Sequence, residues 1–164
     1  MVIHYTKELE KTRKIIEKES YHHFPISDKE RNLNNTDEIL EVYANTKWQI
    51  IDILNKKYKT NFDLHNWIKK QDDEVAHFLC EAGSNALESS QNKSPTAFHL
   101  WLGKKGFIIG IEQNNSFNAQ EINEQRIKVN KGAGFEHYRR SKSTIFFDSP
   151  INTKKIYLHY DLQN

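Results

Sequence analysis

The sequence has little cysteine, little net charge and no long apolar segment. Its single cysteine, Cys80, excludes an internal disulfide and a cysteine metal cluster, and its apolar helical surroundings predict a small core residue. The 24 basic and 22 acidic residues leave a formal net charge of +2, so no global field indicates DNA or an anionic membrane. No apolar run approaches the roughly 20 residues of a spanning helix, and the first residues lack the apolar core of a signal peptide. We therefore expect a cytoplasmic protein that binds neither DNA nor a membrane.

Several catalytic motifs are also absent. The chain contains neither the G-x-S-x-G elbow of hydrolases nor the P-loop pattern G-x-x-x-x-G-K-[ST]. His22 and His23 are adjacent on a predicted strand, so their side chains point to opposite faces and cannot share one ion. The remaining histidines have no paired spacing that favours zinc, and we expect no metal cluster of this kind.

The length and composition indicate one folded domain. A chain of 164 residues with 12% aromatic and 28% charged residues can bury a substantial core and keep a hydrophilic surface. Residues 1–20 are rich in helix formers and poor in apolar surface, so they predict an N-terminal helical arm that is peripheral or docks on a partner. Residues 21–164 form the predicted main domain.

The periodicity of apolar residues predicts alternating helices and strands. The expected helices span residues 6–18, 37–58, 72–90, 118–129 and 135–142, and the expected strands span residues 21–27, 96–103, 107–112, 144–148 and 154–160. Pro25 favours an edge position for the first strand, because proline cannot donate to a neighbouring strand. Long helices combined with sequential strand pairs predict an α/β two-layer sandwich, with a mixed, mainly antiparallel sheet and helices on one face.

The expected helix over 72–90 carries a narrow polar stripe that includes Glu81, Asn85 and Glu88. A carboxylate and an amide one helical turn apart can share a magnesium ion and a water molecule. The alternative is that these residues are ordinary polar groups on the flank of a largely buried helix.

Four motifs then follow one another along the chain. They are Glu81-x-x-x-Asn85, a hairpin that ends in IEQNNSF, the glycine loop KGAGF and the final NTKKIYL. In this order they resemble the ATP-binding domain of the GHKL superfamily, which has the Bergerat-type fold, and most closely that of the anti-sigma-factor serine protein kinases. The resemblance covers about residues 21–162.

The resemblance implies a role for each motif. Glu81 corresponds to the general base and Asn85 to the ligand that holds Mg²⁺ against the triphosphate. Gly132 and Gly134 correspond to the loop whose backbone amides wrap the phosphates of ATP. Thr153 corresponds to the threonine whose hydroxyl supports the adenine-binding carboxylate.

The second motif departs from the family. The family's aspartate, which accepts the adenine amino group, corresponds to Glu112, and the glycine two residues later corresponds to Asn114. A glutamate places its carboxylate one methylene farther out and crowds a fitted adenine, whereas asparagine tolerates the positive φ of the turn. This departure is the basis for an alternative in which nucleotide binding is lost or altered.

Two functional hypotheses follow. In the first, the protein is an ATP- and Mg²⁺-dependent regulatory kinase that transfers the γ-phosphate to a serine of a partner protein. In the second, it is a non-catalytic partner-binding module on the same scaffold, with lost or altered nucleotide binding. The resemblance implies in both cases a regulatory protein partner, anti-anti-sigma or sigma-like, and it allows a homodimer.

Overall fold

The computed structural model describes residues 2–4, 8–26, 36–65, 73–82, 96–121 and 143–162. For residues 2–4, 36, 81–82 and 114–115 only the backbone is described. All structural statements below refer to these residues.

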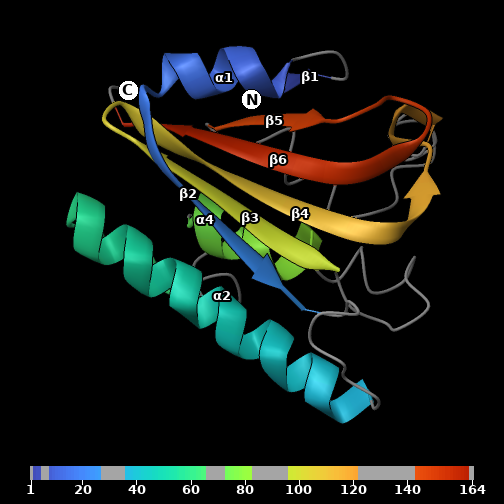
Figure 1. Ribbon diagram of the computed structural model, residues 1–164, viewed down its shortest axis with the longest axis horizontal. Helices are drawn as coiled ribbons and strands as arrows, with labels where there is room; N and C mark the ends of the chain where they lie inside the picture. The colour runs from blue at the N-terminus through green and yellow to red at the C-terminus, as the bar shows by residue number, and fades with distance from the viewer. Residues whose placement is uncertain are drawn as a thin grey trace.

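Six strands form one sheet in the order β1-β5-β6-β4-β3-β2 (Figure 1). The strands are β1 (Val2–His4), β2 (Lys18–Pro25), β3 (Ala97–Gly103), β4 (Gly106–Phe117), β5 (Thr144–Phe147) and β6 (Thr153–Asp161). Every neighbouring pair is antiparallel except β1 and β5, which run parallel. The predicted sandwich with a mainly antiparallel sheet is therefore confirmed.

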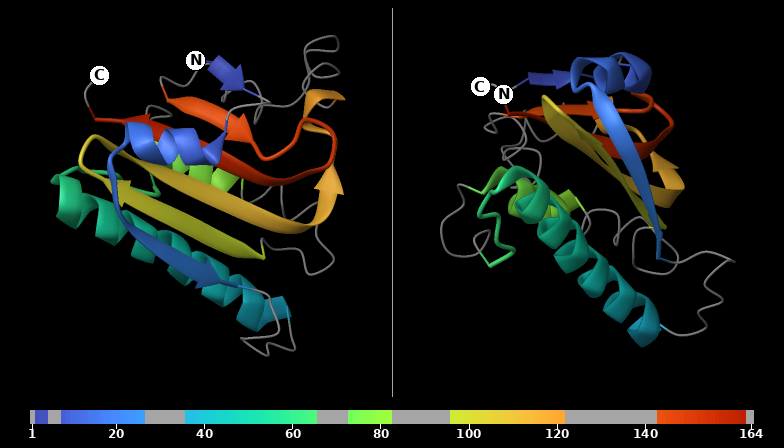
Figure 2. Two further views of the ribbon diagram at one scale, coloured as in Figure 1. Left: turned by 45° about the horizontal axis from the view of Figure 1, so that its top comes forward. Right: turned by 60° about the vertical axis from the view of Figure 1, so that its left-hand side comes forward.

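The described helices lie on both faces of this sheet. They are α1 (Leu9–Ile15), α2 (Thr36–Tyr58), α4 (Glu74–His77) and the π-helix η1 (Phe78–Ala82). Figure 2 shows α2, α4 and η1 against one face and α1 against the other. We call these the helix face and the outer face. No helix within the described ranges is both long and apolar enough to cross a membrane.

The longest helix, α2, forms where the sequence predicts it. Its buried residues Ile39, Tyr43, Ile50 and Leu54 recur at helical spacing and pack on the helix face. Acidic residues occupy its first turn and basic residues its last turn, which complements the helix dipole. The chain leaves the helix through Lys59, whose positive φ of 54° is typical of a residue that ends a helix.

The helix predicted over 72–90 begins close to the expected position. Asp73 caps α4, because its carboxylate accepts a hydrogen bond from the amide of Ala76 at 2.9 Å. The predicted α-helix then continues as the π-helix η1, which the sequence pattern did not indicate. The rest of the predicted helix, and the helix predicted over 135–142, lie outside the described residues. Cys80 is buried in the core, as predicted.

Three features of the sheet differ from the sequence prediction. The short strand β1 was not predicted, and β2 begins at Lys18, within the residues assigned to the N-terminal arm. β4 does not end in a turn after Glu112 but continues to Phe117, which pairs with Thr153 after an irregular stretch and packs against the core. The predicted edge position of Pro25 is confirmed, since β2 is an edge strand.

The two faces of the sheet bury two separate apolar clusters. The main core fills the space between the sheet and α2, α4 and η1. A second cluster, which we call the outer-face cluster, consists of Ile16, Trp101, Ile108, Phe146 and Tyr157. Leu9 of α1 packs against it, so α1 covers part of the outer face rather than extending away from the domain.

The end of α1 is fixed to the turn between β3 and β4. The carbonyl of Ile16 accepts a hydrogen bond from the amide of Lys105 at 3.0 Å. A Cβ atom added to Gly103 would lie 2.1 Å from the same carbonyl oxygen, so only glycine allows this close approach. The docking of α1 therefore depends on contacts at Ile16.

Two adjacent isoleucines test this docking. Ile16 is fully buried, whereas Ile15 is 52% exposed. We expect Ile16→Ala to lower the free energy of unfolding by about 2–5 kcal/mol, because it removes buried methyl groups and leaves a cavity. Ile15→Ala, the matched control, should change it by less than about 0.5 kcal/mol. Urea denaturation measures both, and equal effects would contradict the described packing of α1.

Candidate functional site

The distal end of the β3–β4 hairpin carries Glu112, which corresponds to the adenine-binding aspartate in the resemblance. In the strand register Glu112 lies between Ala97 of β3 and Lys155 of β6. Successive side chains of a strand point to opposite faces, and Ile109 and Ile111 both belong to the main core. Glu112 therefore projects from the outer face. The resemblance implies a nucleotide pocket where the helix predicted over 72–90 meets the sheet, which is on the helix face.

The carboxylate of Glu112 is held by two neighbouring side chains. One of its oxygens lies 3.3 Å from Nε2 of His99 and 3.4 Å from Nζ of Lys155. The hydroxyl of Tyr21 lies 2.7 Å from Nδ1 of the same imidazole. We call these four residues the Glu112 network. It joins β2, β3, β4 and β6 across the outer face.

The contacts of Glu112 lower the pKa of its carboxyl group. The pKa of Glu112 lies below its usual value, chiefly because His99 hydrogen bonds to the carboxylate, and also because Lys155 brings a positive charge nearby; partial burial opposes both effects. The carboxylate is therefore ionised at neutral pH. A neutral His99 satisfies both contacts if Nε2–H donates to Glu112 and Nδ1 accepts from the hydroxyl of Tyr21.

Tyr21 acts as a hydrogen-bond donor in this arrangement. Burial raises the pKa of its phenol, and the negative charge of Glu112 raises it further. The phenol therefore stays protonated at neutral pH and is not an activated nucleophile. With the carboxylate held by two partners, the network is suited to polar recognition rather than to proton abstraction.

Aromatic rings surround the network on β2 and β3. The ring of His99 stacks against those of His23 and Trp101, with centroids 5.0 and 5.8 Å apart respectively. Tyr21 lies across Trp101 at a centroid distance of 5.0 Å, and 45% of its surface is exposed. The network thus joins the buried outer-face cluster to side chains that reach solvent.

Gly110 of β4 leaves space on the outer face for the ring of Tyr157. A Cβ atom at this position would lie 2.9 Å from the ring of Tyr157 and 3.4 Å from Cβ of His99. The glycine in the middle of β4 therefore allows the Tyr157 ring to lie flat on the sheet beside the network.

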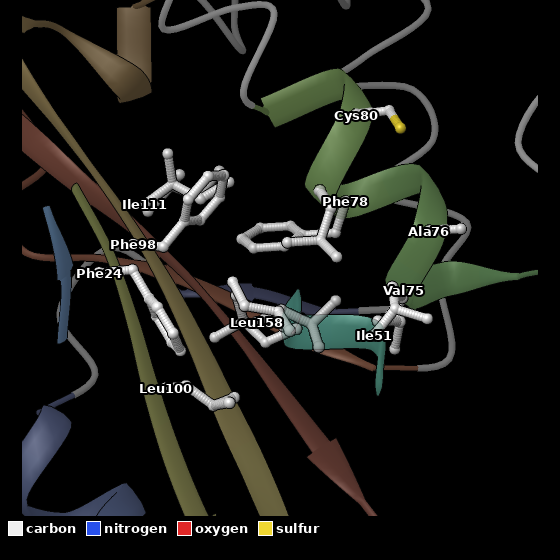
Figure 3. Close-up of a cluster of buried hydrophobic side chains, with 14 of the residues drawn as sticks. Phe24, Ile51, Val75, Ala76, Phe78, Cys80, Phe98, Leu100, Ile111 and Leu158 are labelled. Atoms are coloured by element: carbon white, nitrogen blue, oxygen red, sulfur yellow. The ribbon is translucent and has the colours of Figure 1, made fainter. Parts of the chain in front are cut away.

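Strand alternation assigns the helix face to Gln113, the residue that follows Glu112. Its side chain is buried, with 6% of the residue exposed. The neighbouring space is apolar: Figure 3 shows Phe78 of η1 pointing toward Phe98 and Ile111 of the sheet. After Ile109 and Ile111, the next side chain of β4 on the helix face is therefore that of Gln113, which is an amide and not a carboxylate.

The other residues that the resemblance selects are only partly described. Glu81 lies in η1 and Asn114 in β4, and for both only the backbone is described. Asn85, Gly132 and Gly134 lie outside the described residues. The predicted general base thus falls on the helix face of the fold, whereas Glu112 falls on the outer face.

Thr153 is fully buried and has a different role from the expected one. Its hydroxyl donates to the carbonyl of Ser149 at 2.6 Å and accepts from the amide of Ala119 at 3.4 Å. It therefore closes the turn between β5 and β6 and contacts the segment after β4. It does not support Glu112, which pairs two residues farther along β6, with Lys155.

The position of Glu112 does not fit the adenine contact that the resemblance implies for ATP. The side chains expected at the phosphates and at Mg²⁺ lie outside those described. Within the described residues, no group of three or more His, Cys, Asp or Glu side chains could hold a metal ion.

The sequence interpretation did not identify Tyr21, His99, Lys155 or Gln113 as members of a site. The alternation of side chains could have indicated Gln113, because Ile109, Ile111 and Gln113 are two residues apart and such residues lie on the same face of a strand. The partners of Glu112 depend on strand order and register across the sheet, which local sequence does not reveal.

Comparisons of this chain with protein-family models, with curated proteins and with solved structures found no match.

The lowered pKa of Glu112 predicts an acid-sensitive contribution to stability. This contribution is present above the ordinary glutamate pKa of about 4.3 and is lost as the pH falls through the lower pKa of the folded state. At pH 7 we expect Glu112→Gln to lower the free energy of unfolding by about 0.5–1 kcal/mol, the range of a partly exposed ion pair. The difference from the unmodified protein should shrink on acidification below about pH 4.3.

Urea denaturation at a series of pH values measures this difference. Glu41→Gln, which changes an exposed carboxylate on α2, is the matched control and should have an effect below about 0.5 kcal/mol at pH 7. A difference between the unmodified protein and Glu112→Gln that stayed constant down to pH 3 would contradict the described network.

Proposed function

We propose that this chain is a regulatory protein-binding module on a GHKL-type scaffold, with nucleotide binding lost or altered. The observation that carries the proposal is the position of Glu112, whose carboxylate lies on the outer face in contact with His99 and Lys155. The resemblance assigns the purine to the other side of the sheet. The alternative, a serine protein kinase, needs a carboxylate there.

A rearrangement that brings Glu112 to the helix face is energetically unfavourable. Side chains alternate with a period of two, so β4 would have to shift by one residue. The shift would remove Ile109 and Ile111 from the main core, at about 1.5–3 kcal/mol for each side chain. It would also break the contacts of Glu112 with its two partners.

Gln113 is the side chain that β4 presents to the helix face at this position. An amide oxygen can accept a hydrogen bond from an adenine amino group, but it carries no charge. Hydrogen bonds to an ionised group are roughly twice as strong as those between neutral groups. This favours weakened or altered recognition of a purine over the ATP site implied by the resemblance.

The class of partner comes from the resemblance. Anti-sigma kinases act on regulatory proteins, and we propose a cytoplasmic partner of the same kind, anti-anti-sigma or sigma-like. A module of this type regulates by occupying its partner, so it needs the scaffold and a recognition surface but no transfer of phosphate.

Nucleotide addition tests the proposal. A ligand present at about one hundred times its dissociation constant stabilises the folded state by about 2.7 kcal/mol, which a melting curve resolves. We expect neither Mg-ATP nor Mg-ADP at millimolar concentration to raise the melting temperature of the protein. Magnesium chloride alone serves as the control for salt effects.

Two variants decide how a positive result is interpreted. A nucleotide-dependent shift that disappears in Glu112→Gln would overturn the proposal, because it would assign the purine contact to Glu112. Gln113→Asp places a carboxylate on the helix face, and a shift gained only in this variant would support the proposal.

The unmodified protein, isolated from its own cells at native abundance, should elute as a complex with one stoichiometric partner, with or without Mg-ATP.

A further inference from the structure

An open pocket of about 690 Å³ lies where α1 meets the start of β2 and the β3–β4 turn. It lies beside Gly106, the first residue of β4, whereas Glu112 lies near the middle of this strand, opposite Ala97 of β3. The residues that line it are Glu10, Arg13, Lys14, Glu17, Lys18, Glu19 and Lys104. Every lining residue is charged.

Backbone contacts hold the walls of the pocket together. Glu17 has a positive φ of 53°, which turns the chain sharply from α1 into β2. Its carbonyl accepts a hydrogen bond from the amide of Lys104 at 3.3 Å, and the preceding carbonyl of Ile16 accepts from the amide of Lys105. The three segments that carry the lining residues are thus connected, and the pocket is formed before any ligand arrives.

The acidic residues of the pocket are each neutralised by a cation. Glu10 pairs with Arg13 on α1. Glu17 pairs with Lys105, which is outside the lining set, at 3.2 Å. Glu19 pairs with a lysine of α2, Lys57, at 3.1 Å. The lining carboxylates therefore do not neutralise the remaining basic residues.

Three lysines are left with uncompensated charge. Lys14, Lys18 and Lys104 are exposed, and none forms an ion pair with another described residue. The pocket therefore carries a net positive charge.

We propose that this pocket binds a phosphate-bearing anion. Three ammonium groups around one pocket match a phosphate group, which carries a charge of about −1.5 to −2 at neutral pH and three acceptor oxygens. Lysine binds phosphate as a point charge and needs no fixed bidentate geometry. A single carboxylate carries only about half to two thirds of that charge and would leave most of the positive charge uncompensated.

The proposal does not rest on the proposed function. The pocket and the Glu112 network share no residue. Loss of one site would leave the other in place, and the experiments on the two sites can fail separately.

Isothermal titration with sodium pyrophosphate, without divalent metal ions and at low salt, tests the site. We expect saturable binding that weakens as ionic strength rises, because salt screens exposed charges. Each of Lys14→Gln, Lys18→Gln and Lys104→Gln should weaken binding about threefold to fivefold, and the triple variant about fiftyfold. Lys56→Gln, at an exposed lysine of α2 outside the pocket, should leave the affinity unchanged.

Measurements on the same variants could contradict the proposal. All four substitutions are at exposed positions, so the proteins should fold, which melting curves confirm. Equal affinity of the triple variant and the unmodified protein would overturn the proposal, as would an equal loss in Lys56→Gln. Absence of saturable pyrophosphate binding at low salt would overturn it as well.

Two peptides of identical sequence identify the source of the phosphate. One carries phosphoserine and the other glutamate at the same position. Tighter binding of the phosphoserine peptide than of pyrophosphate supports the site and indicates a phosphorylated protein. Binding of pyrophosphate alone supports the site and indicates a free phosphate compound. Equal binding of both peptides would contradict a phosphate-specific pocket.

Discussion

The alternation of side chains along β4 is the constraint on which the rest of the structure depends. This strand lies between β3 and β6, so its backbone is paired on both edges, and apolar clusters cover both of its faces. Ile109 and Ile111 pack beneath the helices, whereas Ile108 packs in the outer-face cluster. A shift of the strand by one residue would move Ile109 and Ile111 to the outer face and Ile108 to the helix face, so both apolar clusters would lose their packing. The face of Glu112, the last residue before the irregular stretch of β4, is thereby fixed.

Because of this alternation, the carboxylate of Glu112 and the apolar side chains beneath the helices lie on opposite faces of β4. The carboxylate of Glu112 belongs to a polar network on the outer face, with His99, Lys155 and Tyr21. The helix face receives Gln113 and apolar side chains at the same level. The described part of the chain is an α/β sandwich, and Glu112, the residue that the motif selects for a purine contact, lies on its outer face. The proposed protein-binding role needs a recognition surface and does not need a carboxylate on the helix face.

Sequence reasoning located the elements with strong local signals. The apolar spacing over 37–58 indicated the helix α2, and Pro25 indicated an edge strand. β1 has three residues and gains its order from pairing with β5, so no local pattern reveals it. The polar run after Glu112 has the composition of a turn, yet β4 continues because Phe117 reaches the core and pairs with Thr153. The partners of Glu112 come from three other strands, and only the register brings them together.

The central claim is that Glu112 lies on the outer face while its neighbour Gln113 lies on the helix face. Nuclear Overhauser contacts between side-chain protons measure this directly in solution. The account predicts contacts from the Glu112 methylenes to the ring of His99 and to the side chain of Lys155. Contacts from those methylenes to the ring of Phe78 or Phe98 instead would place the carboxylate among the helices and would contradict the account.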